Sequence, residues 1–293
     1  MLKSLIIAII IFYPLLSNDD IYSIISNPRN ISIGGIHAST DDISGAFDSP
    51  LFLNNKNNNI FVSINKYDDL YNIYRMSYCL YANEKSNLLV GMIRREINNN
   101  FNTNFAWEDN GSPPVLEDIN YDEIYSFQDK ETGFFIAYNT LITNNFVMGV
   151  NFKPIFHSID NINSIGISLD VRYALRFLKY KFSFGVDNIL AMKKWDTGLL
   201  EHFDLDGYLS TSVDLSDRFT LFYEYNLIDH SKLGFEMEIV SDFFVRSGYN
   251  NNYHSFGFGF KLNDIHLDYS YFNNNSIVFG DNHSIGFNIN IDN

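Results

Sequence analysis

The feature that most constrains this chain is an alternation of apolar and polar residues that recurs along almost its whole length after residue 58. Between residues 164 and 176, every second side chain is apolar, and the residues between them are small or polar. The same pattern returns at 181–188, 232–240, 264–271 and 283–291. Because successive side chains of a β-strand point to opposite sides, the pattern predicts strands with one apolar and one polar face. We therefore expect an all-β protein.

The alternation predicts fourteen strands, and most of them span about 9–13 residues. Strands of soluble sheets are usually about 5–6 residues long, whereas a tilted strand needs roughly 9–11 residues to cross a membrane. Strand length therefore favours a transmembrane barrel. The predicted strands are 59–67, 72–82, 87–96, 132–142, 145–157, 163–176, 179–188, 199–213, 217–227, 231–239, 242–249, 253–262, 264–272 and 283–291.

The lengths of the predicted connections sort by parity. Links after even-numbered strands are short, and the three longest links, 97–131, 189–198 and 273–282, all follow odd-numbered strands. Barrels of the bacterial outer membrane have even strand numbers, short periplasmic turns and longer external loops. A soluble sandwich or jelly roll, which is the alternative fold, has no reason to sort its loops in this way. The sequence therefore predicts a transmembrane antiparallel β-barrel over residues 59–293.

In such a barrel, the apolar faces meet lipid and the polar faces line the lumen. Isolated charges in a narrow interior are costly, so we expect Arg172 and Arg176 to pair with Glu236 and Glu238 across the barrel. The charges predicted to face the lumen are Asp170, Arg172, Arg176, Glu236, Glu238 and Asp268.

The N-terminus predicts export. Lys3 precedes an apolar run from Leu5 to Leu16, which is followed by polar residues. This layout is typical of a secretory signal peptide, here 1–17, and the run is shorter than the roughly 20 apolar residues of a membrane anchor. Residues 18–58 are rich in small residues and lack a full strand. We interpret them as a plug in the lumen or a cap on the periplasmic end, with a flexible arm as the alternative.

Composition narrows the function classes. The 20 basic and 35 acidic residues give a formal net charge of −15, which argues against nucleic acid as a partner. The seven histidines lack metal-ligand spacing, and Cys79 is the single cysteine. His266 and Asp268, with Glu224, Glu236 and Glu238 on nearby strands, allow an acid–base cluster in the lumen, but a polar lumen wall explains them more simply. We expect no catalytic, cofactor-binding or metal-binding residues, and no enzyme activity.

Three blocks of the chain resemble the PorV/PorQ family of outer-membrane proteins. The first runs from Arg29 through Gly34 and Gly35 to Asp41, Asp42 and the Asp48-Ser49-Pro50 end. The second is the strand pair over 149–174, and the third covers 233–272 together with 283–291. The third block contains the Arg-x-Gly-Tyr and Leu-Asp-Tyr steps that recur in the family. The blocks occur in the family's order.

The resemblance implies a fourteen-stranded barrel like that of FadL-type fatty-acid channels, in the outer membrane of a Gram-negative-type bacterium. It assigns Arg29, Gly34, Gly35, Asp41, Asp42 and Pro50 to the motif of the plug or cap. It also implies a role in protein export or surface display by type IX secretion, with secretion-machinery proteins as partners. Two alternatives stay open: a FadL-like channel for hydrophobic small molecules, and a scaffold or adhesion barrel acting through the loop 97–131. Outer-membrane lipid surrounds the barrel in each case.

Overall fold

The computed structural model describes residues 21–22, 24, 27–37, 43–45, 47–51, 59–67, 70–106, 119–227, 230–274 and 281–291. The expected signal peptide 1–17 lies outside these residues, and so do Asp41 and Asp42 of the plug motif. No helix in this part of the chain is both long and apolar enough to cross a membrane.

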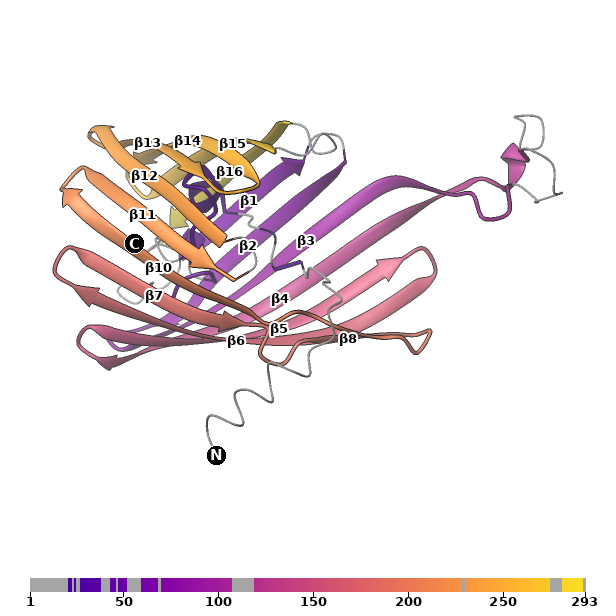
Figure 1. Cartoon of the computed structure of the whole chain (residues 1–293), viewed down its shortest axis with the longest axis horizontal. Coiled ribbons are helices and arrows are strands. Elements are labelled where there is room, and N and C mark those ends of the chain that lie inside the picture. The colour runs from indigo at the N-terminus through magenta and orange to yellow at the C-terminus, as the bar shows by residue number, and fades with distance from the viewer. Residues whose placement is uncertain are drawn as a thin grey trace.

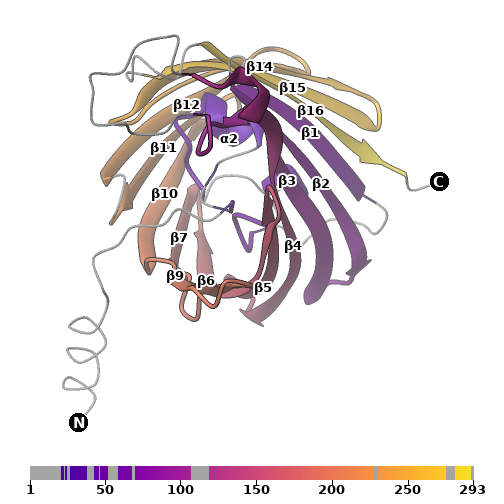
Figure 2. The same ribbon diagram turned by 90° about the vertical axis from the view of Figure 1, so that its right-hand side faces the viewer.

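Fourteen antiparallel strands close into a barrel (Figures 1 and 2), which confirms the predicted fold class. Each strand pairs with its neighbour in the chain, except that β7 pairs with β10. β1 pairs with β16 and β5 pairs with β6, so the ring has no open edge. The barrel strands are β1 (Asn59–Tyr67), β2 (Tyr71–Ala82), β3 (Ser86–Asn102), β4 (Tyr125–Thr143), β5 (Phe146–Ile159), β6 (Ile162–Phe177), β7 (Tyr180–Asp187), β10 (Asp206–Ser216), β11 (Phe219–Asn226), β12 (His230–Val240), β13 (Phe243–Tyr249), β14 (Tyr253–Leu262), β15 (Ile265–Asn274) and β16 (Asp281–Asn290).

The two faces of the wall differ in the way the alternation predicts. In β6, Ile165 and Ile167 are exposed on the outside, whereas Ser168, Asp170 and Arg172 are buried inside. The other strands repeat this pattern, so that the exterior is apolar and aromatic. A closed sheet with an apolar exterior satisfies its backbone internally and can cross a bilayer.

Two regions differ from the expected strands. β3 and β4 pair as far as Asn102 with Tyr125, so much of the expected loop 97–131 is a two-stranded ribbon that projects beyond the barrel (Figure 1). The expected strand 199–213 begins only at Asp206, because residues 188–205 form a separate hairpin. This hairpin consists of β8 (Met192–Trp195) and β9 (Leu200–His202), and β8 pairs with β6 beyond the end of β7.

The N-terminal segment, defined here as the described residues between Ile21 and Leu51, enters the ring. Its helix α2 (Pro28–Ser32) is seen inside the barrel in Figure 2. Asn27 caps the helix by accepting a hydrogen bond from the Arg29 backbone N–H at 3.0 Å, and Pro28 suits the first turn. Gly34 and Gly35 then adopt φ values of +86° and +78°, which L-residues with a side chain rarely adopt. A short 3-10 turn, η1 (Ile43–Gly45), follows.

Candidate functional site: the lumen and its N-terminal segment

The first contact between the segment and the wall is a chain of alternating charges. Arg29 of α2 makes a bidentate pair with Glu236 of β12, at 2.8 and 2.9 Å. Glu236 also pairs with Arg246 of β13 at 2.5 Å, and Arg246 pairs with Asp268 of β15 at 2.5 Å. Paired hydrogen bonds of this kind hold a guanidinium in one orientation. The network therefore fixes the position of α2 against three strands.

The second contact holds the residues that follow the two glycines. The backbone N–H of His37 donates to Glu224 of β11 at 2.7 Å, and its imidazole Nδ1 lies 2.7 Å from the other oxygen of the same carboxylate. Lys232 of β12 is fully buried; its Nζ lies 3.2 Å from Glu224 and donates to the Gly35 carbonyl at 3.2 Å. Burial lowers the pKa of His37, but the Glu224 carboxylate raises it by more, so that the net pKa lies above its usual value of 6.5.

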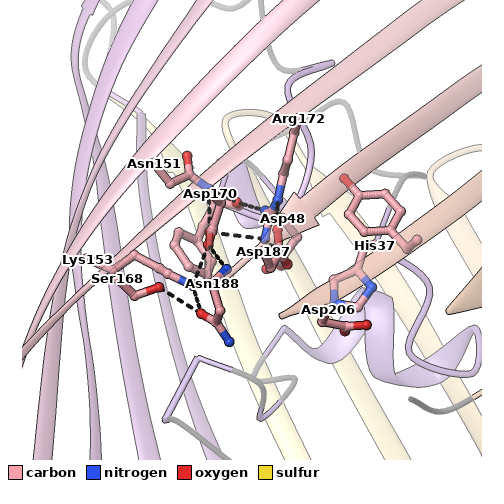
Figure 3. Close-up of polar contacts among 12 residues, drawn as sticks. His37, Asp48, Asn151, Lys153, Ser168, Asp170, Arg172, Asp187, Asn188 and Asp206 are labelled. Carbon is pink, nitrogen blue, oxygen red and sulfur yellow. Dashed lines mark hydrogen bonds and ion pairs between the residues drawn. The ribbon is translucent and has the colours of Figure 1, made fainter. Parts of the chain in front are cut away.

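The third contact lies around Asp48, which Figure 3 shows among Asp170, Arg172 and Asp187. Asp48 pairs with Arg75 of β2 at 3.2 Å. On β5, β6 and β7, Lys153 pairs with Asp170 at 2.7 Å, and Arg172 pairs with Asp187 at 2.7 Å. The carboxylate group of each pair compensates for burying a cation in this narrow interior.

Backbone carbonyls of the segment also accept hydrogen bonds from the wall. Arg172 donates to the Phe47 carbonyl, and Arg176 donates to the Leu51 carbonyl at 2.6 Å. The Phe47 ring packs against Phe135, with ring centroids 4.5 Å apart, and the Arg75 and Arg172 guanidiniums lie 5.5 and 5.4 Å from its centre. Phe47 is thus surrounded by cations that are themselves neutralised by carboxylates.

At one place the segment touches the wall backbone directly. Gly234 of β12 and Gly248 of β13 are partners in the sheet. A Cβ added at Gly234 would lie 2.3 Å from the Ile33 carbonyl oxygen, and one at Gly248 would lie 2.0 Å from the Gly34 nitrogen. Only glycine leaves space for this approach of two backbones.

The expected charges face the lumen, but not in the expected pairs. The prediction that Arg172 and Arg176 pair with Glu236 and Glu238 is wrong. Arg172 contacts Asp187 and Asp170, Arg176 contacts the segment, and Glu238 accepts a hydrogen bond from the Asp242 backbone at 2.9 Å. The alternation of apolar and polar residues predicts which side chains face inward, but it cannot predict which charges from different strands form pairs.

His266 and Asp268 do lie close together, with His266 Nε2 and Asp268 Oδ1 3.5 Å apart. Glu236 is linked to Asp268 through Arg246. Glu224 lies in the separate His37 and Lys232 contact and Glu238 contacts a turn backbone, so the five residues do not form one cluster. Within the described ranges, no group of three or more His, Cys, Asp or Glu side chains has the arrangement of a metal site.

The same inward faces also carry residues that sequence reasoning missed: Arg75, Lys153, Lys232 and Arg246. Each occupies a polar position of an alternating strand, so the alternation itself was the available signal. Of the expected plug motif, Arg29, Gly34 and Gly35 make the contacts described above. Pro50 lies beside Gly149 of β5, where its Cβ would be 3.0 Å from a Cβ added to that glycine.

The barrel has a small cavity in its lumen and a groove on its outer wall. The lumen around Phe47 and Arg75 contains a cavity of about 10 Å³, which is room for about one water. A groove of about 520 Å³ lies on the outer wall over β10 to β14. Its apolar lining includes Leu221, Tyr223, Leu233, Phe235 and Tyr249, and its floor includes Gly234 and Gly248.

These features define a transmembrane β-barrel of fourteen strands whose polar lumen holds the chain's own N-terminal segment. The fold is FadL-like. The chain is similar to a ΔS2S3 mutant of TodX, a monoaromatic hydrocarbon channel of Pseudomonas putida (TM-score 0.67, 8% identity, covering 90% of this chain and 99% of that chain). It is also similar to the toluene transporter TbuX of Ralstonia pickettii (TM-score 0.62, 8% identity, covering 90% of this chain and 98% of that chain). A Pseudomonas aeruginosa FadL homologue is similar as well (TM-score 0.57, 10% identity, covering 91% of this chain and 98% of that chain).

No protein-family model and no curated protein sequence matches this chain. The resemblance to PorV/PorQ therefore gains no support beyond the shared type of barrel. Two of these similar structures, TodX and TbuX, are described as a monoaromatic hydrocarbon channel and a toluene transporter.

Proposed function

We propose that this protein is an outer-membrane channel for hydrophobic small molecules in a Gram-negative-type bacterium. The observation that carries the proposal is the similarity of the whole barrel to channels and transporters described for toluene and monoaromatic hydrocarbons. The similarity covers at least 90% of this chain and 98% of those chains, so it includes the complete ring of strands. Signal-peptide export and insertion into outer-membrane lipid belong to the same proposal.

The groove on the outer wall supports a hydrophobic ligand. Its apolar lining faces the region where hydrophobic molecules concentrate in a bilayer, and burial of apolar surface favours their binding there. Gly234 and Gly248 give the wall no inward side chains at this point, and Ile33 and Gly34 lie directly behind it. A ligand in the groove is thus separated from the lumen only by the sheet backbone and the segment.

In this proposal, residues 18–58 form the plug and residues 59–293 form the channel. The plug occupies the lumen through ion pairs and backbone hydrogen bonds, and its buried apolar side chains, among them Ile31 and Phe47, pack in one core with apolar side chains of the wall such as Phe135. When the plug moves, water can replace the partners of the polar groups, whereas the apolar side chains lose buried surface. Passage through the lumen then requires the segment to shift, and the wall charges that it releases become solvated.

Native mass spectrometry of the detergent-extracted protein tests the proposal. We expect a barrel that carries a small hydrophobic ligand, with or without a bound partner protein. Ser247→Trp, which fills the groove, should reduce the bound fraction, whereas Thr132→Trp on the outer face of β4 should not. Copurifying protein subunits without a ligand would contradict the channel and favour the secretion role of PorV/PorQ type.

A further inference from the structure

The ribbon formed by β3 and β4 extends past every other strand. β2 pairs with β3 only up to Glu96, and β5 pairs with β4 only up to Asp129. Beyond these points, 98–102 and 125–127 pair only with each other among the described residues. We call 98–106 together with 119–127 the arm, and Figure 1 shows it standing clear of the barrel.

The arm is built as a defined structure. Asn102 donates to the Tyr125 hydroxyl at 2.8 Å, and that hydroxyl donates to Asp160 in the β5–β6 turn at 2.8 Å, which braces the base of the arm. Farther out, the Asn120 backbone N–H donates to the Ala106 carbonyl at 2.7 Å. The Asn120 side chain caps the short turn η3 (Tyr121–Glu123). An isolated two-stranded hairpin is only marginally stable in water. These additional hydrogen bonds therefore stabilise the arm in a defined conformation.

Large aromatic side chains are exposed along the arm. Phe101, Phe105 and Tyr121 are 63%, 70% and 65% exposed. They lie beyond the barrel wall, so the bilayer that covers the other exposed aromatic residues does not cover them. Exposed aromatic residues that gather outside a membrane are typical anchors of protein–protein interfaces.

The charged residues in and around the arm are all acidic. Residues 98–127 contain six acidic residues and no Lys, Arg or His. Asp122 and Glu123 are exposed at the end of the arm, next to Tyr121. An anionic lipid surface and a second copy of this chain, whose net charge is −15, would both be repelled. A cationic surface would be attracted.

We propose that the arm is a docking site for a partner protein whose contact surface combines Lys or Arg side chains with apolar ones. Phe101, Phe105 and Tyr121 provide the apolar anchors, and Asp122 and Glu123 select for positive charge. This interaction is independent of ligand passage through the barrel, so either can fail without the other.

Site-specific photocrosslinking of the full chain in its own cells tests the docking site. A benzophenone amino acid replaces Phe105 at the arm or, as a control, Leu178 in the β6–β7 turn, which is 89% exposed. We expect a protein adduct at position 105 alone, mapped to a partner peptide that contains Lys or Arg. Its yield should fall roughly fivefold or more with Phe101→Ala/Tyr121→Ala and with Asp122→Lys/Glu123→Lys.

A matched double reversal, Glu84→Lys/Asp217→Lys, changes exposed acids in the β2–β3 and β10–β11 turns and should leave the yield unchanged. Unchanged heat-modifiable gel mobility shows that each variant retains its barrel. An adduct with lipid alone, no adduct above the level at position 178, or equal yields from all variants would overturn the proposal.

Discussion

At the scale of single residues, the stability of the lumen depends on which carboxylate lies between which cations. Glu236 lies between Arg29 and Arg246, so Glu236→Gln leaves two largely buried guanidiniums without their shared partner. Breaking a buried ion pair costs roughly 3–5 kcal/mol, and we expect a loss of that order in the free energy of unfolding. Urea titration followed by heat-modifiable gel mobility measures this loss.

Glu238→Gln, on the same strand, removes only a contact with a turn backbone and should change stability by about 0.5 kcal/mol or less. Equal losses would contradict the network.

His37 makes the same region sensitive to pH. Its pKa is raised in the folded protein, because the favourable contact with Glu224 outweighs burial and the opposing charge of Lys232. A raised pKa contributes stability that is fully present below the unfolded value of about 6.5 and is lost as the pH rises through the folded value. We therefore expect His37→Gln to destabilise the protein more at pH 5.5 than at pH 8.5. The same urea titration at both pH values measures this difference, and a larger effect at pH 8.5 would refute the assignment.

At the scale of elements, the alternation predicts strands well because each of them separates lipid from a polar lumen. β6 and β14 match their expected ranges to within a residue or so. The pattern fails where that separation ends. The outer part of the β3–β4 ribbon has water on both sides, and the β8–β9 hairpin pairs only with the end of β6. The lumen contacts join residues more than 200 positions apart, such as Arg29 and Glu236, and a local sequence pattern cannot predict such a pairing.

The contact between β12, β13 and the N-terminal segment gives a prediction at this scale. Gly248→Ala places a methyl group against the Gly34 backbone, which has no flexible side chain to move aside. Overpacking of this kind typically costs about 1–3 kcal/mol, and we expect residues 33–35 to move away from the wall. Limited proteolysis should then cut the segment faster. In Gly207→Ala of β10, the added methyl group lies 3.1 Å from the flexible Leu227 side chain and 3.8 Å from the Gly185 carbonyl oxygen, so the cleavage rate should be unchanged.

At the scale of the whole molecule, the ring of strands and the contents of the lumen are stabilised by different interactions. The closed ring of fourteen strands satisfies the backbone inside the bilayer without any help from the segment. The lumen depends on the segment, because Arg75, Glu224 and Glu236 have partners on it. The ring should therefore survive loss of the segment, while the lumen should become hydrated.

Deleting residues 27–51 tests this separation of roles. Among the described residues, the segment leaves a cavity of about 10 Å³ around Phe47, so we expect the intact chain to conduct almost no ions across a planar bilayer. The deletion variant should retain heat-modifiable mobility and form open pores, because water replaces the segment around the wall charges. A second variant, in which a Gly-Gly turn replaces 98–127, loses a similar length of chain outside the barrel and should stay closed. If the deletion variant forms barrels that remain closed, the wall itself seals the lumen. The proposed role of the segment as a plug is then wrong.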